Sequence, residues 1–251
     1  MTDLIHLQDP PIAVRLRVLP RARRFTLRLG APGEPAHLTL PPGVPLAEAE
    51  AFLTRQAGWL TRALDRQPTP VLVISGTILP VDGRPMRIEA QPGACSRRQP
   101  VEIEGDRLLL PGSGSVGPRI AAWLKARARD AMVPRVQHHA AMLGRKLAGV
   151  SLKDTRSRWG SCSSRGRVNL SWRLAMAPPE VQAYLAAHEA AHLVEMNHSE
   201  RFWRVVAKLM PDYDAPRRWL RTEGRGLHRY RFEGDQPSST QAMSSAICSG
   251  G

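Results

Sequence analysis

The sequence has few cysteines and no long apolar run, and both absences restrict the class of protein. Its three cysteines, Cys95, Cys162 and Cys248, are odd in number and widely spaced, which favours a reducing compartment over a disulfide framework. No apolar run approaches the roughly 18 residues that span a bilayer. The first eleven residues include Asp3 and Asp9 and lack the basic and apolar regions of a signal peptide. We therefore expect a cytoplasmic protein without a membrane partner.

Acidic residues are scarce relative to basic ones. The chain has 36 Lys and Arg against 22 Asp and Glu, a net charge of +14. Such an excess favours nucleic acid or another polyanion as a partner, although an arginine-rich proteome produces the same excess. The basic residues are scattered, and neither a nucleic-acid-binding signature nor a phosphate-binding glycine loop accompanies them. The charge therefore leaves a polyanion partner open.

The character of the sequence changes near residue 115. Residues 1–115 contain short segments with apolar alternation, separated by Gly and Pro, which predict strands. One helix is predicted at residues 45–64, where apolar residues recur at helical spacing. A Pro, Gly and Ser-rich stretch at residues 111–115 is typical of a linker. We expect a β-rich N-terminal region, a second domain at residues 116–232, and a disordered tail at residues 233–251 that is rich in Ser and Gly.

The second domain is predicted to contain most of the helices. A long basic helix should cover residues 119–143, and Pro134 should kink it or begin another helix. Strands are expected at residues 150–152 and 167–174, around a Ser and Gly turn. Further helices are predicted at residues 179–195, 199–210 and 215–222. The sequence thus indicates an α+β protein.

The segment His188-Glu189-Ala190-Ala191-His192 is the most informative motif. Histidines four residues apart lie on one face of a helix, so both imidazoles can bind one metal ion. Glu189 then lies where it can reach a water molecule on that metal. A lone histidine on such a helix usually packs in a core, but two with Glu between them and a third nearby favour a metal site. We expect one Zn²⁺ ion.

His198 is the preferred third ligand. It follows His192 by six residues, and Asn197 before it is expected to adopt a left-handed conformation that ends the helix. The chain would then turn back toward the metal, and Ser199 would cap the next helix.

Two glutamates are weaker candidates for the third ligand. Glu195 shares a helix face with His188 but lies about 10 Å farther along the axis, too far for one ion on a straight helix. Glu223 remains an alternative to His198, since some zinc peptidases take a Glu from a later helix.

The three imidazoles would leave a zinc-held water acidic enough to ionise near neutral pH. Glu189 would accept its proton and pass it to the leaving group. Arg156 and Arg158 are candidate donors to a developing oxyanion, or else solvated strand residues. Cys162 as a fourth ligand would close the site and make the zinc structural, which leaves Glu189 without a role.

Several segments in this order resemble the YgjP-like metallopeptidases, which are related to the SprT and WLM zincin-like families. They are residues 158–164, 169–173, 188–192 and 197–199 with Phe202 and Trp203, and the similarity extends over about residues 14–232. The resemblance implies a zincin-like catalytic domain whose HExxH helix packs beside a small antiparallel sheet. It also implies that His188, His192 and His198 are zinc ligands and that Glu189 is the catalytic acid and base.

In zincins a strand edge beside the metal helix commonly holds the peptide by backbone pairing. The predicted hairpin at residues 158–172 is the candidate for that element, with Trp159 as a substrate contact or a core aromatic. The main hypothesis is a zinc metallopeptidase-type hydrolase acting on a protein or peptide. The alternatives are a metal-dependent nucleotide or phosphoanhydride hydrolase, and a nucleic-acid-binding protein with a structural zinc.

Overall fold

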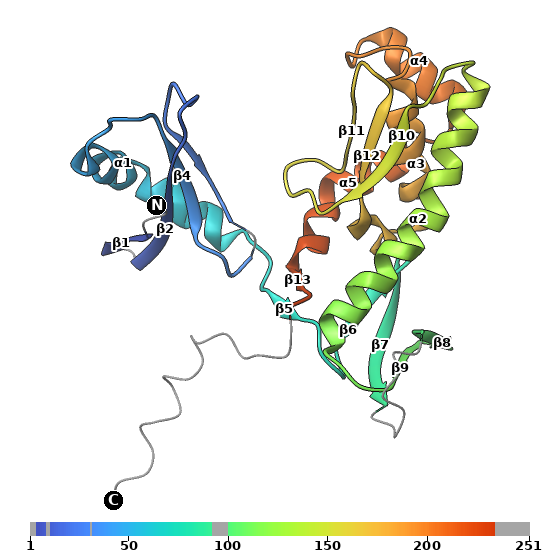
Figure 1. Ribbon diagram of the computed structural model, residues 1–251, viewed down its shortest axis with the longest axis horizontal. Coiled ribbons are helices and arrows are strands. Elements are labelled where there is room, and N and C mark those ends of the chain that lie inside the picture. Colours follow the sequence, from blue (N-terminus) through green and yellow to red (C-terminus); the bar gives the residue numbers. More distant parts are fainter. Residues whose placement is uncertain (1–3, 9–10, 31, 92–99, 234–251) are drawn as a thin grey trace, which may run out of the picture. The chain divides into compact units, whose positions relative to one another are not determined.

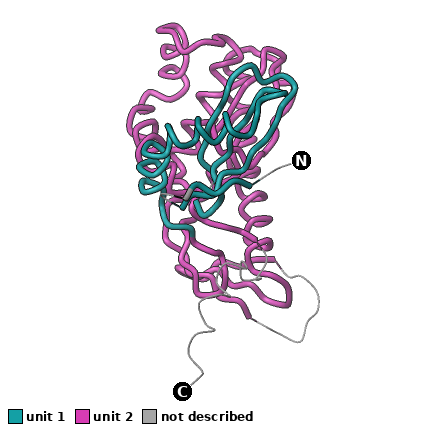
Figure 2. The backbone as a smooth tube through the Cα atoms, turned by 90° about the vertical axis from the view of Figure 1, so that its left-hand side faces the viewer, with its two compact units in different colours: residues 1–70 teal, residues 71–251 magenta. Residues whose placement is uncertain are grey.

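The computed structural model describes residues 4–8, 11–30, 32–91 and 100–233. They form two compact units, residues 1–70 and residues 71–251, which we call unit 1 and unit 2 (Figure 2). The tail expected at residues 233–251 lies, apart from Glu233, outside the described residues. No helix in the described ranges combines the length and apolar character needed to cross a bilayer.

Unit 1 consists of a four-stranded sheet and one helix. The strand order is β1-β2-β4-β3, with β2 and β4 parallel and the two outer pairs antiparallel. Alternate residues of β2 and β4, such as Val14 and Leu38, are buried with Leu53 and Leu60 of the helix. Strand β1 was not predicted from the sequence. The elements are β1 (Leu4–Gln8), β2 (Pro11–Val18), β3 (Thr26–Arg28), β4 (Ala36–Leu40) and α1 (Leu46–Asp65).

Unit 2 begins with short strands that belong to the same core as the helices after them. Leu79, Ile88 and Leu108 of these strands share one apolar cluster with Ile120 and Leu124 of the next helix. The expected boundary at residues 111–115 is therefore replaced by a division after Pro70, because burial of these strands requires that helix. The strands are β5 (Val71–Leu72), β6 (Ile78–Val81), β7 (Arg84–Gln91), β8 (Glu102–Glu104) and β9 (Arg107–Pro111), and the last four form a sheet of order β6-β7-β9-β8.

The long basic helix α2 (Val116–Met142) runs through unit 2 (Figure 1). The helix continues across Pro134 without interruption, so the prediction that a second helix begins there is wrong. Met132 and Val136, on either side of the proline, are both fully buried in the unit 2 core. Packing on both sides thus maintains the helix although proline removes a backbone donor.

A three-stranded sheet lies next in the chain, followed by the helices that carry the motif. Its order is β10-β12-β11, with β11 at one edge. β11 and β12 are antiparallel, but β10 and β12 are parallel. The elements are β10 (Gly149–Lys153), β11 (Gly160–Cys162), β12 (Arg167–Ser171), η1 (Trp172–Met176), α3 (Pro179–Ala191), α4 (Glu200–Leu209), α5 (Asp214–Thr222), η2 (Gly224–Arg229) and β13 (Tyr230–Arg231), which pairs with β5.

The α+β class is confirmed, with two corrections of detail. The small sheet beside α3 is mixed and not wholly antiparallel, because β10 pairs with β12 on the side opposite β11 and runs in the same direction as β12. The strand predicted to reach residue 174 ends at Ser171, where η1 begins. Leu174, Ala175 and Met176 follow one another in this 3-10 turn and are all buried, so burial there does not follow the alternation of a strand.

Candidate metal centre

The structure brings the three predicted histidines together at the end of α3. Nε2 of His188 and Nε2 of His198 lie 3.2 Å apart. With His192, each residue offers one ring nitrogen, and these nitrogens all lie within 4.8 Å of one another. Two nitrogens bound to one tetrahedral zinc at 2.0–2.1 Å are about 3.3 Å apart. The three side chains therefore fit a shared zinc ion.

The chain after α3 reverses earlier than the sequence suggested. The helix ends at Ala191, not at Glu195, and His192 is its C-cap residue in the right-handed helical region. Tight turns follow, in which the amides of Leu193 and Glu195 donate to carbonyls of α3. Asn197 does not adopt a positive φ, so the prediction that it ends the helix in a left-handed conformation is wrong.

Ser199 occupies the N-cap position of α4, as expected, but its side chain makes no cap hydrogen bond. Instead, its amide donates to Oδ1 of Asn197 at 3.3 Å. The short loop between α3 and α4 is thus closed by hydrogen bonds at both ends, and His198 points back to the cluster from it.

Two outer hydrogen bonds orient the imidazoles of α3. Nδ1 of His192 donates to the carbonyl oxygen of Glu195 at 3.0 Å, and Nδ1 of His188 lies 3.4 Å from the hydroxyl of Tyr184. Such partners on one ring nitrogen leave the other free to bind a metal. Tyr184 was not identified from the sequence, although its position one turn before His188 is a usable signal. Glu195 contributes through its backbone and not through its carboxylate.

A buried aromatic residue packs against all three histidines of the cluster. The ring of Phe202, fully buried on α4, lies with its centroid 4.5 to 4.9 Å from the ring centroids of His188, His192 and His198. Burial lowers the pKa of His188 to about 3 and also lowers the pKa of His192. Both imidazoles are therefore neutral at pH 7, which is the form that binds a metal ion.

Glu189 follows His188 along α3 and is buried. Its side chain is only 3% exposed, and Oε2 has no hydrogen-bond partner among the described residues. Burial raises the pKa of this carboxyl to about 8, and the charge of Arg158 acts in the opposite direction. A buried carboxyl with a free oxygen and a pKa near neutrality is suited to proton transfer.

Strand β11 approaches this carboxyl closely because its first residue is a glycine. A Cβ atom at Gly160 would lie 2.6 Å from Cδ of Glu189, well inside van der Waals contact. Glycine at this position therefore allows the backbone of an edge strand to lie against the acid. Apart from the glycine itself, nothing in the sequence indicated this contact.

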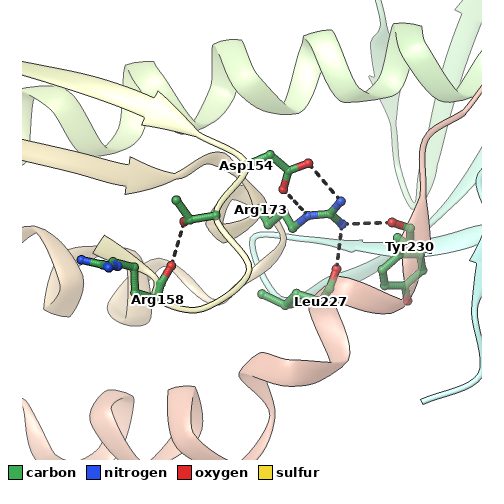
Figure 3. A network of polar contacts seen from close by, with 6 residues as sticks. Asp154, Arg158, Arg173, Leu227 and Tyr230 are labelled. Atoms are coloured by element: carbon green, nitrogen blue, oxygen red, sulfur yellow. Dashed lines mark hydrogen bonds and ion pairs between the residues drawn. The ribbon is translucent and has the colours of Figure 1, made fainter. Parts of the chain in front are cut away.

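Arg173 fixes the loop between β10 and β11, from which Arg158 and Trp159 extend. Its guanidinium donates two hydrogen bonds to Asp154, at 2.7 and 3.2 Å. It also donates to the carbonyl oxygens of Leu227 and Tyr230, at 3.2 and 2.9 Å (Figure 3). The loop is thus tied to the C-terminal segment through one largely buried side chain, which is 12% exposed.

The predicted substrate contacts lie in or next to this loop. The hydroxyl of Thr155 donates to the carbonyl oxygen of Arg158. The guanidinium of Arg158 is exposed, and its positive charge lowers the pKa of Glu189. Arg156 is exposed, and its charge acts on His228 rather than on Glu189. Trp159 is half-buried and stacks on His228 with ring centroids 4.7 Å apart, so one of its faces supports the core. Of these, Arg158 is the cation that acts on the acid.

The other candidate ligands lie outside the cluster. Glu223 is exposed at the end of α5, and the metal-binding group found among the described residues contains only the three histidines. Cys162 is half-buried, and burial together with the charge of Glu189 raises the pKa of its thiol to about 11. Cys162 is not part of the metal-binding group, and a thiol that is protonated at neutral pH is a poor nucleophile.

The comparisons with known proteins bear on this cluster. The model of the YgjP-like metallopeptidase domain matches residues 23–223, which include the three histidines and Glu189. The chain belongs to the YgjP-like metallopeptidase family. This agrees with the resemblance of the motifs, and it indicates a metal-dependent peptidase-type hydrolase.

One solved structure similar to this chain is the metallopeptidase zymogen abylysin of Pyrococcus abyssi. It is 25% identical in sequence, and the match covers 38% of this chain and 96% of that one, with a TM-score of 0.33. None of the curated proteins matches the chain.

Proposed function

We propose that the protein is a zinc-dependent peptidase that hydrolyses an amide bond of a protein or peptide. In this proposal His188, His192 and His198 hold one zinc ion, and Glu189 is the general base and acid. Membership of a metallopeptidase family supports the reaction class. The observation that carries the proposal is the convergence of three ring nitrogens within 4.8 Å, beside a buried carboxyl with an unpartnered oxygen.

A zinc ion held by three imidazoles would acidify a water molecule and polarise the carbonyl that is attacked. Glu189 would take the proton from the attacking water through its free Oε2 and then donate it to the leaving amine. In the metal-free protein, burial raises the pKa of this carboxyl to about 8, so its neutral form is accessible near neutral pH. A carboxyl that can both take up and release a proton can act first as base and then as acid.

The edge strand β11 is the proposed binding element for the peptide. It pairs with β12 on one side only, and its first residue lies against Glu189. An extended peptide that paired with the other side of β11 would bring a carbonyl group close to the acid. Arg158, whose charge already acts on Glu189, would stabilise negative charge that develops on that carbonyl oxygen.

The test compares Glu189→Gln with a matched variant, Glu180→Gln, which changes an exposed residue in the first turn of the same helix. Casein, a peptide mixture and nucleoside triphosphates are incubated with each zinc-loaded protein. We expect peptide cleavage by the wild type and by Glu180→Gln, with a loss of roughly 10²–10⁴-fold in Glu189→Gln, because general acid-base catalysis is worth about that much. Zinc content should be equal in all three.

Two results would contradict the proposal. Hydrolysis of nucleoside triphosphates without peptide cleavage would favour the phosphoanhydride hydrolase. Equal behaviour of Glu189→Gln and the wild type, with zinc bound in both, would favour a structural zinc.

A further inference from the structure

A second feature of unit 2 lies directly beside the histidine cluster. A pocket of about 380 Å³ opens there, and His192 is part of its wall. Three cationic residues line it, Arg145, Lys146 and Arg165, together with Ser163 and Ser164. No acidic residue lines it among the residues that the structure describes. We call this feature the basic pocket.

The charge of the basic pocket is unbalanced, in contrast to that of another pocket in unit 2. That second pocket, of about 470 Å³, is lined by Asp82 and Asp130 as well as Arg127 and Arg135, and Arg127 forms an ion pair with Asp82. In the described ranges, no ion pair involves the three cations of the basic pocket. Like charges gathered without a carboxylate attract an anionic ligand.

Backbone contacts hold together the two segments that carry the cations of the basic pocket. Arg145 and Lys146 follow the end of α2, and Arg165 belongs to the turn between β11 and β12. The amide of Ala148 donates to the carbonyl oxygen of Gly166 at 2.9 Å, and a Cβ at Gly166 would lie 3.0 Å from the carbonyl oxygen of Lys146. The two segments are therefore packed against each other, and their cations are brought together by the fold.

Strand β11 connects the basic pocket to Glu189. β11 runs from Gly160, which contacts Glu189, to Cys162, and Ser163 of the pocket follows directly. A strand rises about 3.3 Å per residue, so the pocket begins about 10 Å along β11 from the acid. A peptide paired with β11 would therefore place a side chain at the pocket two or three residues from the bond at Glu189.

We propose that the basic pocket binds an anionic side chain of the peptide substrate, a carboxylate or a phosphate, within three residues of the cleaved bond. This inference rests on the proposed peptidase function. Arg145, Lys146 and Arg165 supply the charge, and the hydroxyls of Ser163 and Ser164 supply hydrogen bonds to the anion. The substrate class that follows is an acidic or phosphorylated peptide segment.

Binding is tested separately from cleavage, with the full-length zinc-loaded Glu189→Gln protein. Acetylated tripeptide amides with Glu, phosphoserine or Gln between two alanines are titrated, and the backbone amides are followed by NMR. We expect Glu and phosphoserine, but not Gln, to shift the amides of Ser164, Arg165 and Gly166. The affinity should fall as the salt concentration rises, because exposed charges are screened. The Glu and phosphoserine arms distinguish the two sources of the anion.

Two arginine variants provide the matched comparison. Arg165→Gln removes a cation of the pocket, and Arg129→Gln makes the same change at an exposed position on α2 outside it. Removing one exposed charge pair is worth up to about 1 kcal/mol, so Arg165→Gln should weaken binding of the Glu peptide by about fivefold. Arg129→Gln should leave it unchanged. Equal binding of Glu and Gln peptides, no shift with any peptide, or equal binding to both variants would overturn the inference.

Cleavage then separates this inference from the proposed function. With a random peptide mixture, the wild type should favour acidic residues within three positions of the cleaved bond, and Arg165→Gln should lose that preference. Cleavage without such a preference would overturn the pocket and leave the peptidase standing. Binding of the acidic peptides by a protein that cleaves no peptide would overturn the peptidase and leave an anion site.

Discussion

The interiors of the two units differ in the kind of side chain that they bury. The core of unit 1 is apolar, with residues such as Val14, Leu38 and Leu53. The four buried polar or charged side chains of the described residues, Ser171, Gln182, Glu189 and His192, all belong to unit 2. Burial of a polar group is unfavourable unless a partner compensates it. The distribution therefore indicates that unit 2 is the part of the molecule that buries polar side chains at a cost in folding free energy, as a functional site requires.

Two of these buried side chains, both on α3, show the difference between structural and functional polarity. The amide of Gln182 donates to Oδ1 of Asp82 at 2.8 Å and to the carbonyl oxygen of Ala177 at 3.0 Å. Oε2 of Glu189, two turns farther along the same helix, has no such partner among the described residues. A satisfied group stabilises the fold, whereas an unsatisfied one is available to a substrate or a water molecule.

The largest expected effect on stability tests unit 1. Leu53→Ala removes a fully buried side chain from α1 and should reduce the free energy of unfolding by about 2–5 kcal/mol. Zinc content should not change, because the candidate ligands all belong to unit 2. Denaturant unfolding and elemental analysis check the two parts. Loss of zinc together with the loss of stability would contradict the separation of the units.

An intermediate effect on stability is expected where β11 contacts Glu189. Gly160→Ala places a methyl group against the carboxyl of Glu189 and should destabilise the protein by about 1–3 kcal/mol, as overpacking does. Peptidase activity should fall at least about tenfold, since displacement of the acid by 1 Å is enough to slow a reaction strongly. Zinc should remain bound, because the histidines are not touched.

The matched control for this variant lies in unit 1. Gly58→Ala, in helix α1, adds a methyl group that meets only the flexible end of Arg62 at 3.5 Å. It should stabilise the protein by about 0.5–1 kcal/mol, because alanine is favoured over glycine inside a helix. Thermal unfolding of both variants gives the comparison. A Gly160→Ala protein as stable and active as the wild type would refute the close contact.

A small effect is also expected on the pH dependence of stability. In zinc-free protein the folded-state pKa of Glu189 is raised to about 8 from 4.5, so the proton that it holds stabilises the folded state. That stabilisation is fully present below pH 4.5 and is lost as the pH rises through 8. Between pH 7 and 8 the unfolding free energy of the wild type should therefore fall by about 1 kcal/mol relative to Glu189→Gln. Parallel pH profiles for the two proteins would show that Glu189 is not buried as described.

The local parts of the structure were predictable from the sequence. The spacing of His188, His192 and His198 identified the cluster, and the apolar repeat predicted α1. The contact of Gly160 with Glu189 was not predictable, because it joins a strand to a helix that follows much later in the chain. The division after Pro70 depends in the same way on which helix buries the strands of unit 2, and the linker-like composition of residues 111–115 was misleading.

The three-histidine site is tested most directly by the zinc content of the purified protein beside that of His188→Ala, His198→Ala and Glu223→Ala. We expect about one zinc per chain in the wild type and in Glu223→Ala, and a large loss in both histidine variants, because removal of one of three ligands leaves the ion weakly held. Full zinc content in His198→Ala together with loss in Glu223→Ala would contradict this site and would make Glu223 the third ligand.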